Sequence, residues 1–258
     1  MRRRLYRGIV LALVVLVHLQ CEEPPDKVLL RASAKGDMAA VRQLVDAGVD
    51  VNTTGEHLGT PLHNAVRGGY TEMVVFLIDH RADVRARYKR GWTPLHTAAY
   101  HGRTDAAKLL VQKGAEVDAL DDDQGTALFL AVMQEHKAIV ELLIAKGAGI
   151  HKLDKYSETP LHRAARFGQA GMAEILIEKG ARVNAAPKYG WTPLHLAAQK
   201  GYINVADVLI RHGANVNPKD REGRTPFDAA AESLPEKERK AMVAFLQKHG
   251  AKPGRPQK

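Results

Sequence analysis

The sequence Thr60-Pro61-Leu62-His63 returns along this chain at multiples of 33 residues. Full copies are Thr93-Pro94-Leu95-His96, Thr159-Pro160-Leu161-His162 and Thr192-Pro193-Leu194-His195, and degraded copies are Thr126-Ala127-Leu128-Phe129 and Thr225-Pro226-Phe227-Asp228. A period of this length predicts a solenoid, in which each repeat buries its apolar face only against its neighbours. The function of a solenoid lies on its extended surface, so we do not expect a catalytic pocket.

Within one repeat the residue types predict a helix, a turn, a second helix and a loop. Threonine before proline is a helix start, because the hydroxyl can cap free backbone N–H groups and proline suits the first turn. Alanine always stands five residues after the threonine: Ala65, Ala98, Ala131, Ala164, Ala197 and Ala230. Leucines mark the apolar stripe of the second helix: Leu77, Leu110, Leu143, Leu176 and Leu209. Glycines such as Gly102 separate the helices, and glycines such as Gly147 end the second one.

The pattern continues beyond the threonine-led copies in both directions. It reaches back to Lys27 and forward to about Lys252, and the end copies carry extra charge, as terminal repeats facing water should. We therefore expect seven repeats over residues 27–252, starting near residues 27, 60, 93, 126, 159, 192 and 225. Residues 253–258 are expected to form a flexible basic tail.

The Thr-Pro-Leu-His pattern with this period resembles the ankyrin repeat over nearly all of the chain after residue 26. The resemblance implies an all-α solenoid of stacked helix-turn-helix units, with short β-hairpin fingers and a concave binding groove. It also implies a non-catalytic protein–protein interaction module. The repeat that starts at Thr126 departs from the pattern, with Ala127, Phe129 and Glu135 replacing proline, histidine and the interhelix glycine. Arg81 stands where the second helix of another repeat would end in glycine, which predicts a left-handed backbone there.

Composition and motifs narrow the possible chemistry. The 258 residues carry a formal charge of +9, and removing residues 1–20 leaves 34 basic and 29 acidic residues, a mild excess of five. The single cysteine, Cys21, excludes an internal disulfide and argues against structural zinc. The repeat histidines are 33 or more residues apart, too far to share one metal ion, and no phosphate-binding or catalytic motif occurs. We expect no enzyme activity, no metal, no cofactor and no small-molecule substrate.

Residues 1–26 predict attachment to a membrane. Four arginines precede the apolar run Ile9–Val17, as in a secretory signal or an N-terminal membrane anchor over residues 1–20. With Cys21 at its end and residues 21–26 as a tether, the segment resembles a bacterial lipoprotein signal, which implies lipidation of Cys21. His18 and Gln20 depart from that signal, so an uncleaved anchor and a cytosolic chain remain alternatives. Either form of attachment predicts an extracytoplasmic location.

Aromatic and basic residues gather at the positions that would face the groove. In ankyrin repeats these positions lie four, three and one before the threonine, and seven and eight after it. The resulting candidates for binding a partner are Lys89, Arg90, Trp92, Tyr100, His101, Lys155, Tyr156, Arg166, Phe167, Lys188, Tyr189, Trp191 and Lys200. Such residues are typical of binding hot spots, and their charge favours an acidic protein or peptide. Trp92 and Trp191 could instead pack against their own fingers.

Two other functions fit some of the sequence. Nucleic-acid binding is suggested by the basic total, but Asp121-Asp122-Asp123 would repel phosphates. These aspartates either neutralise part of the neighbouring basic finger or are solvated loop charges. A passive structural spacer is the other alternative, and it predicts that changes in the groove have no effect.

Overall fold

In a computed structural model, which describes residues 23–55 and 59–254, the regular elements are helices and two isolated β-bridges. The chain divides into two compact bodies, Met1–Asp122 and Asp123–Lys258. The helical content confirms the all-α class expected from the sequence. The expected signal or anchor, with Cys21, and residues 255–258 of the expected tail lie outside the described residues.

The N-terminal body alternates inner helices with outer helices, and its inner helices α4 and α6 begin at repeat threonines. Its described helices are α2 (Pro25–Lys35), α3 (Met38–Asp46), α4 (Pro61–Gly68), α5 (Thr71–Asp79), the 3₁₀ turn η1 (Lys89–Gly91), α6 (Pro94–Tyr100) and α7 (Thr104–Gln112). Inner helix α4 packs between α2 and α6, and outer helix α5 contacts α7. Neighbouring repeats thus share one apolar seam.

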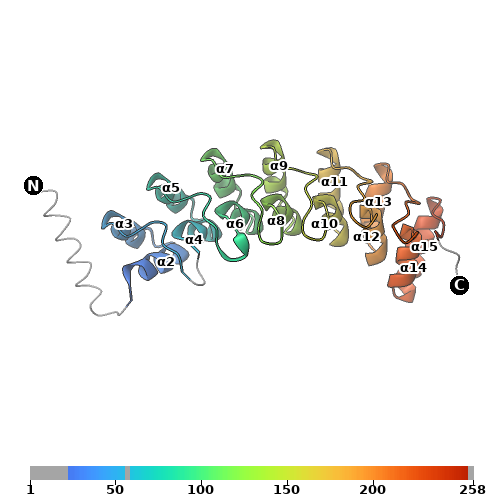
Figure 1. Ribbon diagram of the computed structural model, residues 1–258, viewed down its shortest axis with the longest axis horizontal. Helices are drawn as coiled ribbons and strands as arrows, with labels where there is room; N and C mark the ends of the chain where they lie inside the picture. Colours follow the sequence, from blue (N-terminus) through green and yellow to red (C-terminus); the bar gives the residue numbers. More distant parts are fainter. Residues whose placement is uncertain (1–22, 56–58, 255–258) are drawn as a thin grey trace, which may run out of the picture. The chain divides into compact units, whose positions relative to one another are not determined.

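The C-terminal body repeats this arrangement. Its described helices are α8 (Ala127–Met133), α9 (Lys137–Ala145), α10 (Pro160–Arg166), α11 (Ala170–Glu178), α12 (Pro193–Lys200), α13 (Ile203–Arg211), α14 (Pro226–Ser233) and α15 (Glu236–Lys248). Inner helices α8, α10, α12 and α14 succeed one another side by side, and the outer helices cover one flank (Figure 1). The alanines and leucines that recur in each repeat are fully buried, as Ala164 and Leu176 show. These two sets of residues form the core, as the sequence predicts.

The threonines cap the inner helices as the sequence predicts. In the repeats that carry Thr-Pro-Leu-His, the threonine hydroxyl accepts a hydrogen bond from the backbone N–H of the histidine three residues later. The histidine Nδ1 accepts in return from the threonine backbone N–H. The two residues thus satisfy each other's backbone at the helix start.

The repeat that starts at Thr126 lacks this exchange. Phe129 replaces the histidine, no side-chain bond caps α8, and the buried Thr126 hydroxyl has no hydrogen-bond partner. A buried hydroxyl without a partner costs about 1–3 kcal/mol. This repeat is therefore locally weaker than its neighbours.

The fingers that precede the inner helices are tight turns. In the finger of α10, Oδ1 of Asp154 accepts from the backbone N–H groups of Tyr156 and Glu158, and Asp220 does the same before α14. The expected β-hairpins are reduced to turns because these carboxylates satisfy the N–H groups that a strand ladder would use. Asp121 is also buried, so it differs from the solvated loop charge that the sequence allowed.

Several turns place non-glycine residues in the left-handed region. Arg81 has φ 69° and Glu135 has φ 58°, at positions where other repeats carry glycine. Gly147, which stands two repeats after Arg81, has φ 87°, and a Cβ atom added there would meet no other atom within 4 Å. The prediction that Arg81 adopts a left-handed backbone is confirmed.

The segment after α15 folds back onto the start of α14. Asp228 replaces the histidine, and its Oδ2 accepts from the backbone N–H groups of Thr225 and Gly254. The Thr225 hydroxyl donates to the carbonyl of Lys252 at 2.9 Å. Residues 252–254 therefore contact the capping residues Thr225 and Asp228.

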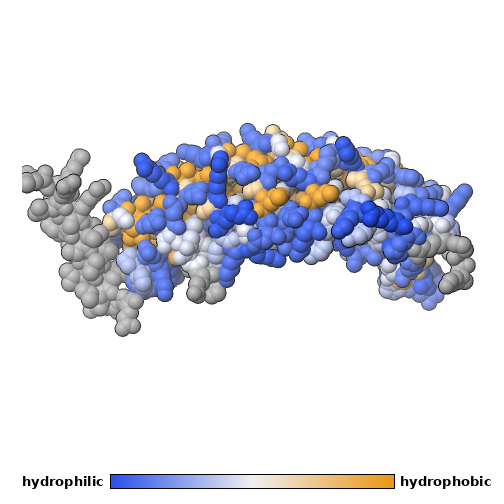
Figure 2. Space-filling view, viewed as in Figure 1, coloured by the Kyte–Doolittle hydropathy of each residue, from blue (hydrophilic) through white to orange (hydrophobic). Residues whose placement is uncertain are grey.

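The outer helices leave some apolar surface in contact with water. Figure 2 shows apolar strips between hydrophilic stretches over α5 and α7, and over α9 and α11. Val75 on α5 is an exposed example. None of the described helices is both long and apolar enough to cross a membrane.

Candidate functional site

Exposed apolar side chains concentrate at the positions that the sequence marked for binding. Among the described residues the exposed large hydrophobic side chains are Val75, Tyr100, Leu120, Leu153, Tyr156, Phe167 and Tyr189. Tyr100, Tyr156, Phe167 and Tyr189 all lie in fingers or at the C-terminal ends of inner helices. We call this side of each body the finger face. Core packing does not explain these four side chains, because they contact water.

The finger face of the N-terminal body contains a basic groove of about 190 Å³. Its lining is His63, Arg67, Tyr88, Lys89, Arg90, Trp92, Thr97 and His101. The lining includes three basic side chains and no carboxylate. Beside it the Trp92 and Tyr100 rings lie 5.1 Å apart, and Tyr100 meets His101 edge-on at the same distance.

The finger face of the C-terminal body contains a larger groove of about 410 Å³. We call it the C-terminal groove. Its lining is Tyr156, Ser157, Glu158, His162, Arg166, Pro187, Tyr189, Trp191, Leu196, Gln199, Asp220, Arg221, Glu222 and Arg224. The volume lies in the range of about 300–1,000 Å³ that is common for ligand pockets.

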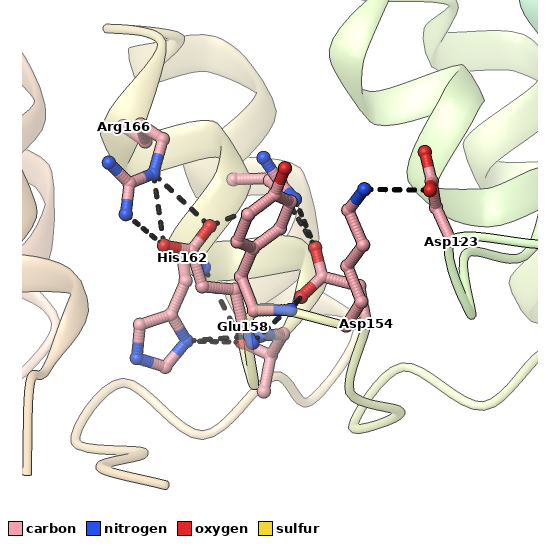
Figure 3. Close-up of polar contacts among 9 residues, drawn as sticks. Asp123, Asp154, Glu158, His162 and Arg166 are labelled. Atoms are coloured by element: carbon pink, nitrogen blue, oxygen red, sulfur yellow. Dashed lines mark hydrogen bonds and ion pairs between the residues drawn. The ribbon is translucent and has the colours of Figure 1, made fainter. Parts of the chain in front are cut away.

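Two residues of the C-terminal groove lining, Glu158 and Arg166, belong to a chain of alternating charges (Figure 3). Asp154 pairs with Arg163, Arg163 approaches Glu158 at 3.3 Å, and Glu158 holds Arg166 through Nε and Nη2. Asp154 and Glu158 are each only 6 % exposed. Because both buried carboxylates are paired, these contacts position Arg163 and Arg166.

Each aromatic ring of the groove has a basic side chain over it. Lys155 and Arg163 both lie 5.0 Å from the Tyr156 ring centre. Lys188 lies 5.3 Å from the Tyr189 ring, and Arg224 lies 5.3 Å from the Trp191 ring. These are cation–π distances, so each ring already has a cation of the protein as its partner.

A family model for ankyrin repeats matches residues 29–121, 115–187 and 183–257, which is most of the chain. The chain belongs to the ankyrin repeat family. Among solved structures, the human ASB11 ankyrin repeat domain is 27% identical with a TM-score of 0.75, and the match covers 87% of this chain and 98% of that one. The Bcl-3 ankyrin repeat domain, from the IkappaB protein family, is 28% identical with the same TM-score, over 87% and 100% of the two chains.

A curated relative matches only a short piece. The mouse 2-5A-dependent ribonuclease is 43% identical over 53 residues, which is 20% of this chain and 7% of that protein. Ankyrin repeat domains are generally protein–protein interaction modules, and the fold is typically non-catalytic. The finger face of these ankyrin repeats is therefore the candidate binding surface.

Histidines at the starts of the inner helices connect the ankyrin core to the groove. Nε2 of His162 donates to the carbonyl of Trp191, and Nε2 of His195 donates to the carbonyl of Arg224. Burial lowers the pKa of His162 and of His195 below the ordinary value. Burial also lowers the pKa of His63 to about 4. The neutral imidazoles therefore act as structural connectors between repeats.

The remaining predicted residues lie around the grooves. Lys89 and Arg90 form η1, where Arg90 has φ 62°. Lys155 bonds to Asp123 at 2.7 Å, a contact that raises the pKa of Lys155. Lys188 and Lys200 are exposed on the finger face. Trp92 and Trp191 are half-buried, with Trp92 beside Tyr100 and Arg224 over the Trp191 ring.

Some lining residues were missed by sequence reasoning. Arg221, Glu222 and Arg224 precede Thr225 by four, three and one residues, and Arg67 follows Thr60 by seven. The rule that identified the other candidates, applied to every repeat, would have found them. Asp220 could not be found in this way. Burial would raise its pKa, but hydrogen bonds from Arg224 and from backbone N–H groups lower it overall.

Metal binding finds no support in the part of the chain that is described. Residues 23–55 and 59–254 contain no cluster of three or more potential metal-ligating side chains.

Proposed function

We propose that this ankyrin repeat protein binds an acidic protein or peptide through its finger face, and that its N-terminal segment attaches it to a membrane. The observation that carries the binding proposal is the exposure of Tyr100, Tyr156, Phe167 and Tyr189 on the finger face of the two bodies. Exposed aromatic side chains beside arginine are typical of the residues that dominate binding energies.

The charge of the grooves favours an acidic partner. Arg67, Lys89 and Arg90 line the N-terminal groove without any carboxylate. In the C-terminal groove the carboxylates of Glu158 and Asp220 are buried in ion pairs with arginines. Glu222, the third carboxylate of this lining, is 60% exposed and lies 3.4 Å from Arg224. The basic side chains beside the exposed aromatic rings support attraction of a partner of opposite charge.

Site-specific photo-crosslinking tests the binding proposal. A photoreactive phenylalanine analogue is placed in the full chain at position 189, at position 100, or at the control position 75 on outer helix α5. We expect covalent adducts with one protein from positions 189 and 100, and not from position 75. Adducts mainly from position 75 would move the interface to the outer helices. Absence of adducts at all three positions would favour the spacer function.

Membrane attachment rests on the sequence of residues 1–26 alone. The basic head and apolar run support either lipidation at Cys21 or an uncleaved anchor. Mass spectrometry of the membrane fraction distinguishes the two forms. A diacylated peptide that begins at Cys21 supports the first form, and an intact Met1 terminus supports the second. Recovery of the whole protein from the soluble fraction would refute both.

A further inference from the structure

We infer that the C-terminal groove takes one large apolar side chain of the partner. Carboxylates of the partner beside that side chain contact the arginines of the groove. Cationic side chains of the partner are excluded. This rests on the proposed function and specifies the ligand chemistry of one site. Three features of the groove support it.

The first feature is the apolar part of the lining. Tyr156 and Tyr189 are 57% and 55% exposed, and with Trp191 and Leu196 they surround the 410 Å³ volume. Rigid aromatic side chains bury large area with little loss of conformational entropy. A leucine, phenylalanine or similar side chain between these rings would remove much of this exposed surface from water.

The second feature is the position of the protein's own cations. Tyr156, Tyr189 and Trp191 each already have a lysine or arginine about 5 Å from the ring centre. An aromatic pocket without such neighbours would attract an ammonium or guanidinium group. In this groove a ligand cation would instead approach Lys188 or Arg224 and be repelled.

The third feature is the orientation of the ion pairs. Glu158 uses Nε and Nη2 of Arg166, which leaves the N–H groups of Nη1 for an incoming anion. Oδ1 of Asp220 accepts from backbone N–H groups and its Oδ2 accepts from Nε of Arg224. Glu158 and Asp220 are thus engaged, and Glu222, the exposed carboxylate of the lining, lies 3.4 Å from Arg224. The exposed Arg221 adds a further positive charge at the lining. Carboxylates of a ligand fit these donors.

Binding of defined peptide pools to the purified full chain in detergent tests the inference. Each pool has large apolar residues at its centre, flanked by glutamate, by glutamine or by lysine, and carries a fluorescent label for anisotropy measurements. We expect the glutamate pool to bind about tenfold more tightly than the glutamine pool, as about 1.4 kcal/mol from a charge-assisted contact predicts. The lysine pool should bind more weakly than the glutamine pool.

Matched variants locate the effect in the groove. Arg221→Gln should remove most of the preference for glutamate over glutamine. Arg182→Gln makes the same charge change at an exposed position outside the groove lining and should leave the preference intact. Tyr189→Ala should weaken binding of all pools, whereas Val75→Ala, an exposed apolar residue on outer helix α5 and outside this lining, should not.

Several results would overturn the inference. These are equal binding of the glutamate and glutamine pools, tighter binding of the lysine pool, equal effects of Arg221→Gln and Arg182→Gln, or no binding of any pool. If crosslinking from position 189 succeeds while every pool fails to bind, the inference falls and the proposed function stands. Failure of both experiments would refute both.

Discussion

Nε2 of His162 lies 2.9 Å from the carbonyl oxygen of Trp191, which stands 29 residues later and in the next repeat. Since a carbonyl can only accept, Nε2 carries the proton and Nδ1 is free to accept from Thr159. The same link joins His63 to Trp92 at 3.1 Å. Buried helix caps therefore hold the backbone of both groove tryptophans in place.

Acidification should destabilise the protein because these imidazoles must stay neutral. His63 has a folded-state pKa of about 4, below the ordinary value of 6.5. The unfolded chain therefore binds more protons between those two values, and stability is lost as pH falls through that window. For His63 alone the unfolding free energy should be lower by about 2 kcal/mol at pH 5 than at pH 7.5. His162 and His195 shift in the same direction.

Urea unfolding at the two pH values measures this effect. His63→Gln should flatten the pH dependence, whereas His151→Gln, at an exposed position, should leave it unchanged. Equal or greater stability at pH 5 would show that the imidazoles are not held neutral by the fold.

The two threonines Thr126 and Thr159 should respond oppositely to removal of the hydroxyl. Thr159→Val deletes the acceptor for the backbone N–H of His162 and should lower the unfolding free energy by about 1–2 kcal/mol. Thr126→Val removes a buried hydroxyl without a partner and should be neutral or stabilising. Thermal unfolding of both variants provides the comparison, and equal losses would mean that Thr126 is capped in solution.

Backbone strain at Arg81 predicts a stabilising substitution. Its φ of 69° costs a side-chain-bearing residue about 1 kcal/mol, so Arg81→Gly should raise the melting temperature. The reverse change, Gly147→Arg at φ 87°, should lower it. Calorimetry of both variants checks this. A fall in the melting temperature of Arg81→Gly would mean that the turn is built differently.

Removal of a charge should be costly at Glu158 and nearly harmless at Glu222. Glu158→Gln removes the buried partner of Arg166 and one of the two carboxylates beside Arg163, and it should lower the unfolding free energy by about 2 kcal/mol. Glu222 pairs with Arg224 at 3.4 Å, but its side chain is largely exposed to water. Glu222→Gln should therefore lower the unfolding free energy by less than about 1 kcal/mol. Denaturant titrations measure both changes. Similar losses of unfolding free energy in the two variants would show that the ion pairs of Glu158 are solvated.

Much of the fold could be predicted because residues close together in the sequence determine where each helix begins and ends. Thr159, Pro160 and His162 specify a capped helix start from sequence alone, and Gly147 marks the helix end. The left-handed backbone at Arg81 followed from the same comparison of repeats. Local signals of this kind do not depend on the rest of the fold.

Pairings between side chains could not be predicted in the same way. Arg166 was expected to contact a partner, and the spacing gave no sign that Glu158 holds it, because that pairing depends on the finger turning back over α10. The cap that Gly254 donates to Asp228 was also missed, since it depends on the chain folding back after α15. Three-dimensional proximity, and not residue type, decides such contacts.

The affinity of the crosslinked partner for the purified protein tests the central claim most directly. Isothermal titration compares the wild-type chain with the combined variant Tyr100→Ala, Phe167→Ala and Tyr189→Ala, after circular dichroism has confirmed that the variant is folded. Loss of these exposed side chains should weaken binding at least about tenfold, because such residues supply the anchors of an interface. Unchanged affinity in the folded triple variant would contradict binding through the finger face.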